Sequence, residues 1–108
     1  MAKYIFSSLI NCGICNDKKY KGIKERNKNK YICSNYQLKN CIRNILIEDN
    51  ILKFLKIYCD KNNIKFESTQ LLAQQHIEKI IALPNSCFEI YYRNGDIQYC
   101  KDNGIKFV

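Results

Sequence analysis

The sequence contains no tryptophan, one proline, one histidine and four glycines among its 108 residues. Because proline and glycine are so scarce, no segment has the composition of a linker, and the length fits one compact domain or a small module with an appendage. The chain also lacks paired carboxylates, a Ser/His/Asp set and a glycine-rich phosphate loop. We therefore expect that the protein is not an enzyme.

Long hydrophobic runs are absent as well. No apolar stretch approaches the roughly 18 residues that a membrane-spanning helix requires. The opening residues, Met1 to Phe6, are too short and too polar for a secretory signal peptide. These absences predict a cytoplasmic protein with no membrane partner.

Acidic residues are few: 10 Asp and Glu stand against 18 Lys and Arg, which gives a net charge of +8. The imbalance is local, because residues 1–56 hold 12 of the basic and 4 of the acidic residues, whereas residues 57–108 are neutral overall. A local cationic excess favours a polyanionic partner, most commonly nucleic acid. The alternative is a solvated surface that keeps the protein soluble.

Cysteine, by contrast, is abundant. Seven cysteines cannot all pair within one chain, and in a reducing compartment clustered cysteines are more often metal ligands than disulfides. Four of them follow the pattern Cys12-x2-Cys15 and Cys33-x7-Cys41, which suits the tetrahedral thiolate coordination of zinc. We therefore predict a closed, structural Zn²⁺ site. The cysteines outside this pattern lie in apolar stretches and are interpreted as packed thiols: Cys59, Cys87 and Cys100.

The order of the sequence patterns predicts an α+β fold, in which a zinc β-ribbon precedes two short helices and a C-terminal β-hairpin. We expect the four-cysteine ribbon at residues 1–44, with β-prone residues 4–10 at its start and a basic turn at residues 25–29. Residues 45–108 are expected to supply the helices and the hairpin, and to pack with the ribbon as one compact unit.

The second segment has its own local signals. Apolar residues recur at helical spacing over residues 45–58, and a second helical pattern follows Ser68, a candidate N-cap. Asn94-Gly95 predicts a hairpin turn between strands over residues 87–93 and 97–100, because both turn residues tolerate a positive φ.

The residues around the cysteines follow a further pattern. Phe6-Ser-Ser-Leu-Ile-Asn-Cys12-Gly-Ile-Cys15 is followed by Tyr31-Ile-Cys33-Ser-Asn, by Cys41 and by a helix opening at Ile47-Glu48. Later in the chain, His76-Ile-Glu-Lys-Ile-Ile81 precedes Phe88-Glu-Ile-Tyr-Tyr-Arg-Asn-Gly95. In this order the segments resemble the zinc-ribbon, C-terminal DNA-binding domain of large serine recombinases and integrases.

The resemblance implies a DNA-binding module of site-specific DNA recombination or integration in a mobile element, without the catalytic domain that carries the family's nucleophilic serine. Double-stranded DNA is then the expected partner, with a two-stranded ribbon in the major groove. The residues expected to contact DNA are basic and lie in or beside the ribbon: Lys18, Lys19, Lys21, Lys24, Arg26, Lys28, Lys30 and Arg43.

The alternative is a small mobile-element protein that binds a recombinase or another nucleic-acid enzyme, and regulates or inhibits it through protein–protein contacts. Its contact surface would be the aromatic residues of the neutral second half: Phe88, Tyr91, Tyr92 and Tyr99.

Overall fold

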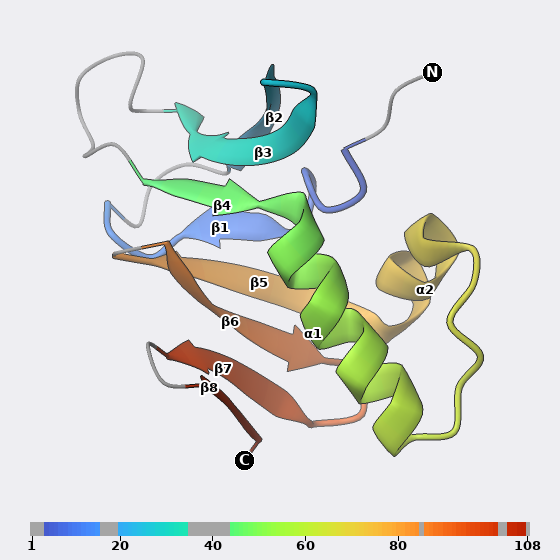
Figure 1. Cartoon of the computed structure of the whole chain (residues 1–108). Coiled ribbons are helices and arrows are strands. Elements are labelled where there is room, and N and C mark those ends of the chain that lie inside the picture. Colours follow the sequence, from blue (N-terminus) through green and yellow to red (C-terminus); the bar gives the residue numbers. More distant parts are fainter. Residues whose placement is uncertain (1–3, 16–19, 35–43, 85, 102–103, 108) are drawn as a thin grey trace.

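The structure, a computed structural model, describes residues 4–15, 20–34, 44–84, 86–101 and 104–107. One group of strands comprises β1 (Ile10–Cys12), β5 (Ile77–Leu83), β6 (Cys87–Tyr92), β7 (Ile97–Lys101) and β8 (Gly104–Phe107). The other elements are β2 (Tyr20–Glu25), β3 (Lys28–Cys33), β4 (Ile45–Ile47), α1 (Glu48–Lys61) and α2 (Thr69–His76). The larger sheet has the strand order β1-β5-β6-β7-β8 and the smaller sheet the order β2-β3-β4 (Figure 1). The predicted α+β class is confirmed.

Helix α1 lies across one face of the larger sheet (Figure 1). The Phe54 ring meets the Phe88 ring edge-on, with 4.8 Å between their centroids, and the Tyr58 ring stacks on Tyr92 at 3.7 Å. Because side chains alternate between the faces of a strand, Phe88 and Tyr92 both point toward the helix, and each is at most 2% exposed. This aromatic layer is the centre of the hydrophobic core.

Strands β2 and β3 form a hairpin that supplies two of the three strands of the smaller sheet (Figure 1). Its two turn residues, Arg26 and Asn27, have φ values of 52° and 63°, and positive φ at both central residues is the mark of a type I′ turn. Near the base of the hairpin, the buried Tyr31 hydroxyl donates to Glu48 at 2.6 Å and accepts the Phe6 backbone N–H at 3.0 Å. The hairpin is thereby tied to the first residue of α1.

In both sheets, a strand that precedes residue 44 pairs with a strand that follows it. Strand β1 runs parallel to β5 in the larger sheet, with Ile10 opposite Ile80 and Cys12 opposite Ala82. Strand β4, which follows residue 44, instead pairs with β3 of the hairpin. Residues Ile10–Cys12, which lead into the first cysteine pair, are therefore built into the same sheet as the C-terminal strands.

Two sequence-based expectations about the first elements are wrong. Residues 45–47 were expected to open a helix, but Leu46 lies opposite Tyr31 in β4 and α1 begins only at Glu48. Tertiary pairing with β3 outweighs the helical spacing there, as β-branched isoleucines favour. Residues 4–10 were expected to be β-prone, but the chain turns over residues 5–9, where Ser7 N–H donates to the Tyr4 carbonyl at 3.2 Å, and only Ile10 belongs to strand β1.

The later elements agree better with expectation. The predicted C-terminal hairpin is confirmed as β6 and β7, and Gly95 in its turn has a φ of 99°. Ser68 precedes α2, but the prediction that it caps the helix is wrong, because its backbone is left-handed and its side chain makes no capping hydrogen bond.

Candidate metal centre

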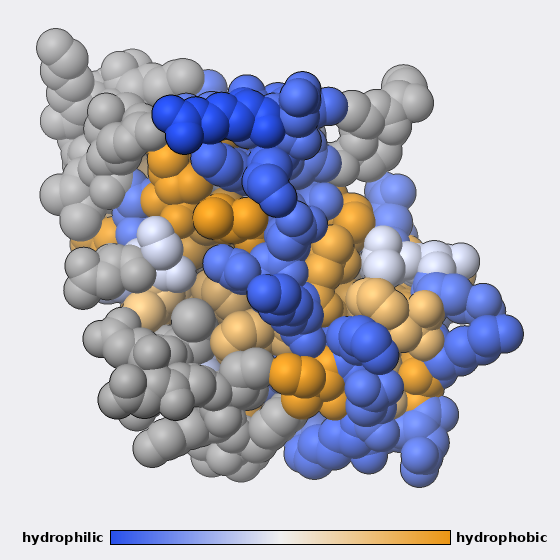
Figure 2. All heavy atoms as spheres, viewed as in Figure 1, coloured by the Kyte–Doolittle hydropathy of each residue, from blue (hydrophilic) through white to orange (hydrophobic). Residues whose placement is uncertain are grey.

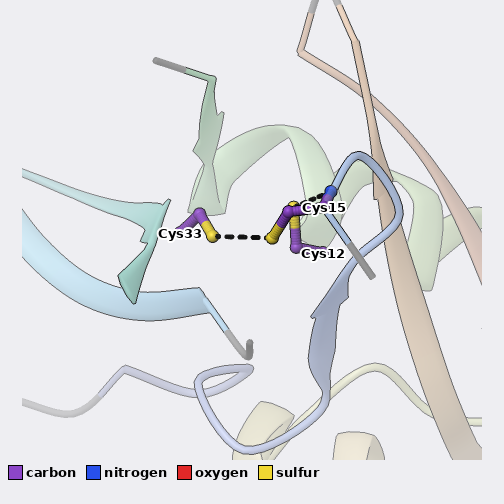
Figure 3. A group of neighbouring side chains, drawn as sticks. All are labelled: Cys12, Cys15 and Cys33. Atoms are coloured by element: carbon purple, nitrogen blue, oxygen red, sulfur yellow. Dashed lines mark hydrogen bonds between the residues drawn. The ribbon is translucent and has the colours of Figure 1, made fainter. Parts of the chain in front are cut away.

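Three cysteines meet where the two sheets join. Cys12 is the last residue of β1, Cys15 lies in the turn that follows, and Cys33 is the last residue of β3. Their sulfur atoms all lie within 4.8 Å of one another, and the group can hold a metal ion (Figure 3). In this cluster, Cys12 belongs to the larger sheet and Cys33 to the smaller one.

The three thiols differ in how far they are buried. Cys12 is 3% exposed, Cys33 is fully buried, and Cys15 is partly exposed. The Cys15 and Cys33 sulfurs lie 3.7 Å apart, and the Cys15 backbone N–H points at the Cys12 sulfur from 3.5 Å. Such an N–H···S contact stabilises negative charge on the sulfur and holds the Cys-x2-Cys turn in a fixed shape.

Gly13 allows this turn to lie against the larger sheet. Its backbone N–H donates to the Ala82 carbonyl at 2.8 Å, which extends the β1–β5 pairing by one residue. A Cβ atom added at Gly13 would lie 2.6 Å from that carbonyl oxygen and 2.7 Å from the Ile81 side chain. Only glycine fits between the cysteines at this position without displacing β5 or the turn.

The fourth predicted ligand, Cys41, lies outside the described residues. The structure thus brings together three of the four predicted ligands, which confirms a cysteine cluster that could hold a metal ion. Of the cysteines expected to be packed thiols, Cys59 is fully buried, and this burial raises the pKa of its thiol. Cys87 is partly exposed, and the side chain of Cys100 lies outside the described part of the chain.

Two residues beside the cluster did not stand out in the sequence. Tyr20 lies directly opposite Cys33 and is 2% exposed, and the Cys12 thiol is a close neighbour of its hydroxyl. Burial is the main reason why the pKa of Tyr20 lies well above its usual value, whereas a hydrogen bond from Asn44 lowers it in part. Asn44 carries no sequence signal of this role, because its other partners come from the distant β5–β6 connection.

The basic side chains predicted to contact DNA are divided over the hairpin. In the β2–β3 register Lys21 lies opposite Ile32 and Glu25 opposite Lys28, so these side chains share one face with Lys30. Lys24 belongs to the opposite face, and Arg26 lies at the tip. The remaining predicted contacts, Lys18, Lys19 and Arg43, lie outside the described residues.

Two of these lysines have acidic neighbours. Lys28 lies 3.5 Å from Asp49 with both side chains at least 60% exposed, and exposed pairs of this kind contribute little to stability. Lys30 lies 3.3 Å from Glu25 and its side chain is only 17% exposed. Lys24 and Arg26 are exposed as well.

A groove lies between the hairpin tip and the β5–β6 connection. Its volume is about 650 Å³ and its lining combines aliphatic and charged residues: Glu25, Arg26, Lys30, Ile45, Ile47 and Ser86. Figure 2 shows hydrophobic atoms gathered over β4, beneath a hydrophilic row from the hairpin. Charged and apolar surface therefore adjoin each other at this groove.

In comparisons with known proteins, no family model, curated protein or solved structure is significantly similar to the chain. The resemblance to the recombinase zinc ribbon therefore stays a prediction. Among the described residues, no helix has both the length and the apolar character needed to cross a bilayer.

Proposed function

We propose that the chain is a DNA-binding module in which a structural zinc ion fixes a cationic β-hairpin. The observation that carries the proposal is the cysteine cluster at the base of the β2–β3 hairpin, whose described residues include five basic side chains. Cys12, Cys15 and Cys33 would supply three thiolates and Cys41 the fourth. Four thiolates leave no open coordination position, so the ion would have a structural role and no catalytic one.

The sulfur positions support zinc as the metal. A tetrahedral ion with Zn–S bonds of about 2.3 Å separates its sulfurs by about 3.8 Å. The Cys15 and Cys33 sulfurs lie 3.7 Å apart. Soft thiolate ligands also favour zinc over magnesium or calcium, which prefer oxygen.

The hairpin supports DNA as the partner. A two-stranded ribbon fits the major groove, and its cations can contact phosphates on either side. Arg26 at the tip is the best-placed residue to contact a guanine edge, while Lys24 and Lys28 are exposed for phosphate contacts. The motifs around the cysteines resemble those of the serine recombinase zinc ribbon. We therefore also propose that the module derives from a serine recombinase and lacks its catalytic domain. A reducing cytoplasm would keep the thiols available for the metal.

Salt-dependent binding to duplex DNA tests this function. The dissociation constant is measured by fluorescence anisotropy at several salt concentrations, for the wild-type protein and for the double variant Lys24→Gln/Lys28→Gln. Several phosphate contacts predict a steep fall in affinity with salt, and the double variant should reduce the slope of log K against log salt by about two.

A matched control removes a charge elsewhere. Lys65 is 82% exposed and pairs with Glu67 in the α1–α2 connection, away from the hairpin strands. Lys65→Gln should leave the slope unchanged, and a wild-type affinity that does not vary with salt would contradict DNA binding.

The groove supports a second candidate function, in which the chain binds a protein. Ile45 and Ile47 are partly exposed there beside Arg26 and Lys30, so a segment that combines aliphatic and acidic side chains would complement the lining. The aromatic residues first considered for this role are less suitable, because Phe88 and Tyr92 are buried under α1. Ile47→Asp would weaken binding of such a partner and leave the salt slope for DNA unchanged.

A further inference from the structure

Asn44 is a buried polar residue whose hydrogen bonds fix its orientation. It is 4% exposed, and its side-chain oxygen accepts the Ser86 backbone N–H at 2.8 Å. Its side-chain nitrogen donates to the Leu83 carbonyl at 2.8 Å and to the Tyr20 hydroxyl at 2.9 Å. Because a backbone N–H only donates and a carbonyl only accepts, the amide cannot be turned around.

This orientation determines where the Tyr20 proton points. Asn44 has only N–H groups to offer the Tyr20 oxygen, so the hydroxyl is an acceptor toward Asn44 and its own proton is directed elsewhere. Tyr20 is 2% exposed, which leaves little access for water, and the Cys12 thiol is a close neighbour of its hydroxyl that can accept a hydrogen bond. A chain of donors can therefore run from Asn44 through Tyr20 to the Cys12 sulfur.

We propose that Tyr20 is a positioning residue of the metal centre, which donates a hydrogen bond to the Cys12 thiolate and is itself directed by Asn44. This inference rests on the proposed metal site. Hydrogen bonds from outside the ligand set orient metal ligands and tune their charge, and their loss lowers metal affinity. The same contacts join the metal centre to the β5–β6 connection, since Asn44 also binds Leu83 and Ser86.

Tyr31 provides a matched control in the same hairpin. It is fully buried, like Tyr20, and its hydroxyl makes two hydrogen bonds. Those bonds go to Glu48 and to the Phe6 backbone, and neither partner is a cysteine. Tyr31→Phe therefore removes a buried hydroxyl without removing a donor from the cluster.

The experiment titrates Co²⁺ into the wild type, Tyr20→Phe and Tyr31→Phe, and follows the thiolate-to-cobalt charge-transfer band together with urea unfolding. Tyr20→Phe should lower Co²⁺ affinity about 10- to 100-fold and shift the band, because the Cys12 sulfur loses a hydrogen bond. Tyr31→Phe should unfold at lower urea concentration but keep the wild-type affinity and band. Equal affinities and identical bands for the two variants would overturn the inference.

A second variant keeps the tyrosine in place, in case Tyr20→Phe does not fold. Asn44→Asp puts an acceptor where the amide donated, so the Tyr20 proton turns away from Cys12 and the band should shift as in Tyr20→Phe. An unshifted band would contradict the donor chain. If the wild-type protein binds no Co²⁺ or Zn²⁺, the metal site itself is wrong, and this outcome is distinct from a failure of Tyr20 alone.

Discussion

Arg26 and Asn27 occupy the hairpin turn with a left-handed backbone, at φ values of 52° and 63°. For residues other than glycine this conformation is strained, at a cost of about 1–2 kcal/mol per residue. Asparagine tolerates it better than arginine because its short polar side chain can hydrogen-bond locally. A strained arginine at an exposed tip lowers stability, so it is consistent with selection for contact with a partner.

Replacing Arg26 with glycine should therefore separate folding from binding. Arg26→Gly is expected to raise the free energy of unfolding by about 0.5–1 kcal/mol, because relief of strain exceeds the added chain entropy. The same variant should weaken DNA binding and relax the sequence preference at the base pair that Arg26 contacts. Urea denaturation and anisotropy on one protein preparation measure both effects.

Asn27→Gly is the companion variant. It also relieves a positive φ but keeps the charge of Arg26, so stability should rise without a change in DNA affinity. If Arg26→Gly retained full affinity for DNA, Arg26 would have no role in binding and the contact surface would lie elsewhere.

At the scale of elements, the contact of β1 with β5 depends on the glycine between the first two cysteines. Gly13→Ala would place a Cβ atom 2.6 Å from the Ala82 carbonyl oxygen, so the turn must move away from β5. We expect loss of the 2.8 Å Gly13–Ala82 hydrogen bond, a destabilisation of about 1–3 kcal/mol and weaker Co²⁺ binding. Co²⁺ titration and urea denaturation measure these effects.

Gly95→Ala is a suitable comparison for that experiment. Gly95 has a φ of 99°, but an added Cβ atom would meet no atom within 4 Å. Its cost should be backbone strain alone, with metal affinity unchanged. Wild-type metal affinity in Gly13→Ala would show that the cysteine turn does not need its contact with β5.

Elements with local signals were predictable from the sequence, and elements formed by distant pairing were not. Asn94-Gly95 marks a hairpin within a few residues, and the Cys-x2-Cys spacing marks the cysteine turn, so both were found. Strand β4 was missed because its partner β3 lies earlier in the chain and its three residues also continue the helical spacing of α1. Asn44 was missed for the same reason, since Leu83 and Ser86 are far from it in sequence.

At the scale of the whole molecule, the cysteine cluster joins two sheets. Cys12 belongs to the larger sheet and Cys33 to the smaller one, and Asn44 adds hydrogen bonds across the same junction. An ion bound there would cross-link parts of the protein that are far apart in the sequence. Metal binding would then contribute to the stability of both sheets, because binding free energy is coupled to folding.

Metal removal tests this coupling. A chelator added to the metal-loaded protein should lower the melting temperature and speed hydrogen exchange at amides in both β3 and β5. Added Zn²⁺ should restore protection, whereas Mg²⁺ should not, because magnesium binds thiolates poorly. Faster exchange confined to β2 and β3 would mean that the larger sheet is stable without the ion.

The parallel pairing of Ile10 with Ile80 also has a consequence for the order of folding. The β2–β3 hairpin can close as soon as its own residues leave the ribosome, since only two residues separate the strands. Strand β1 is synthesised earlier but has no partner until β5 emerges, and closing so long a loop slows folding. Until then Phe6 and Ile10, both fully buried in the native core, are exposed to solvent, where apolar side chains promote aggregation. A nascent chain of this protein should therefore depend on chaperones until β5 has been made.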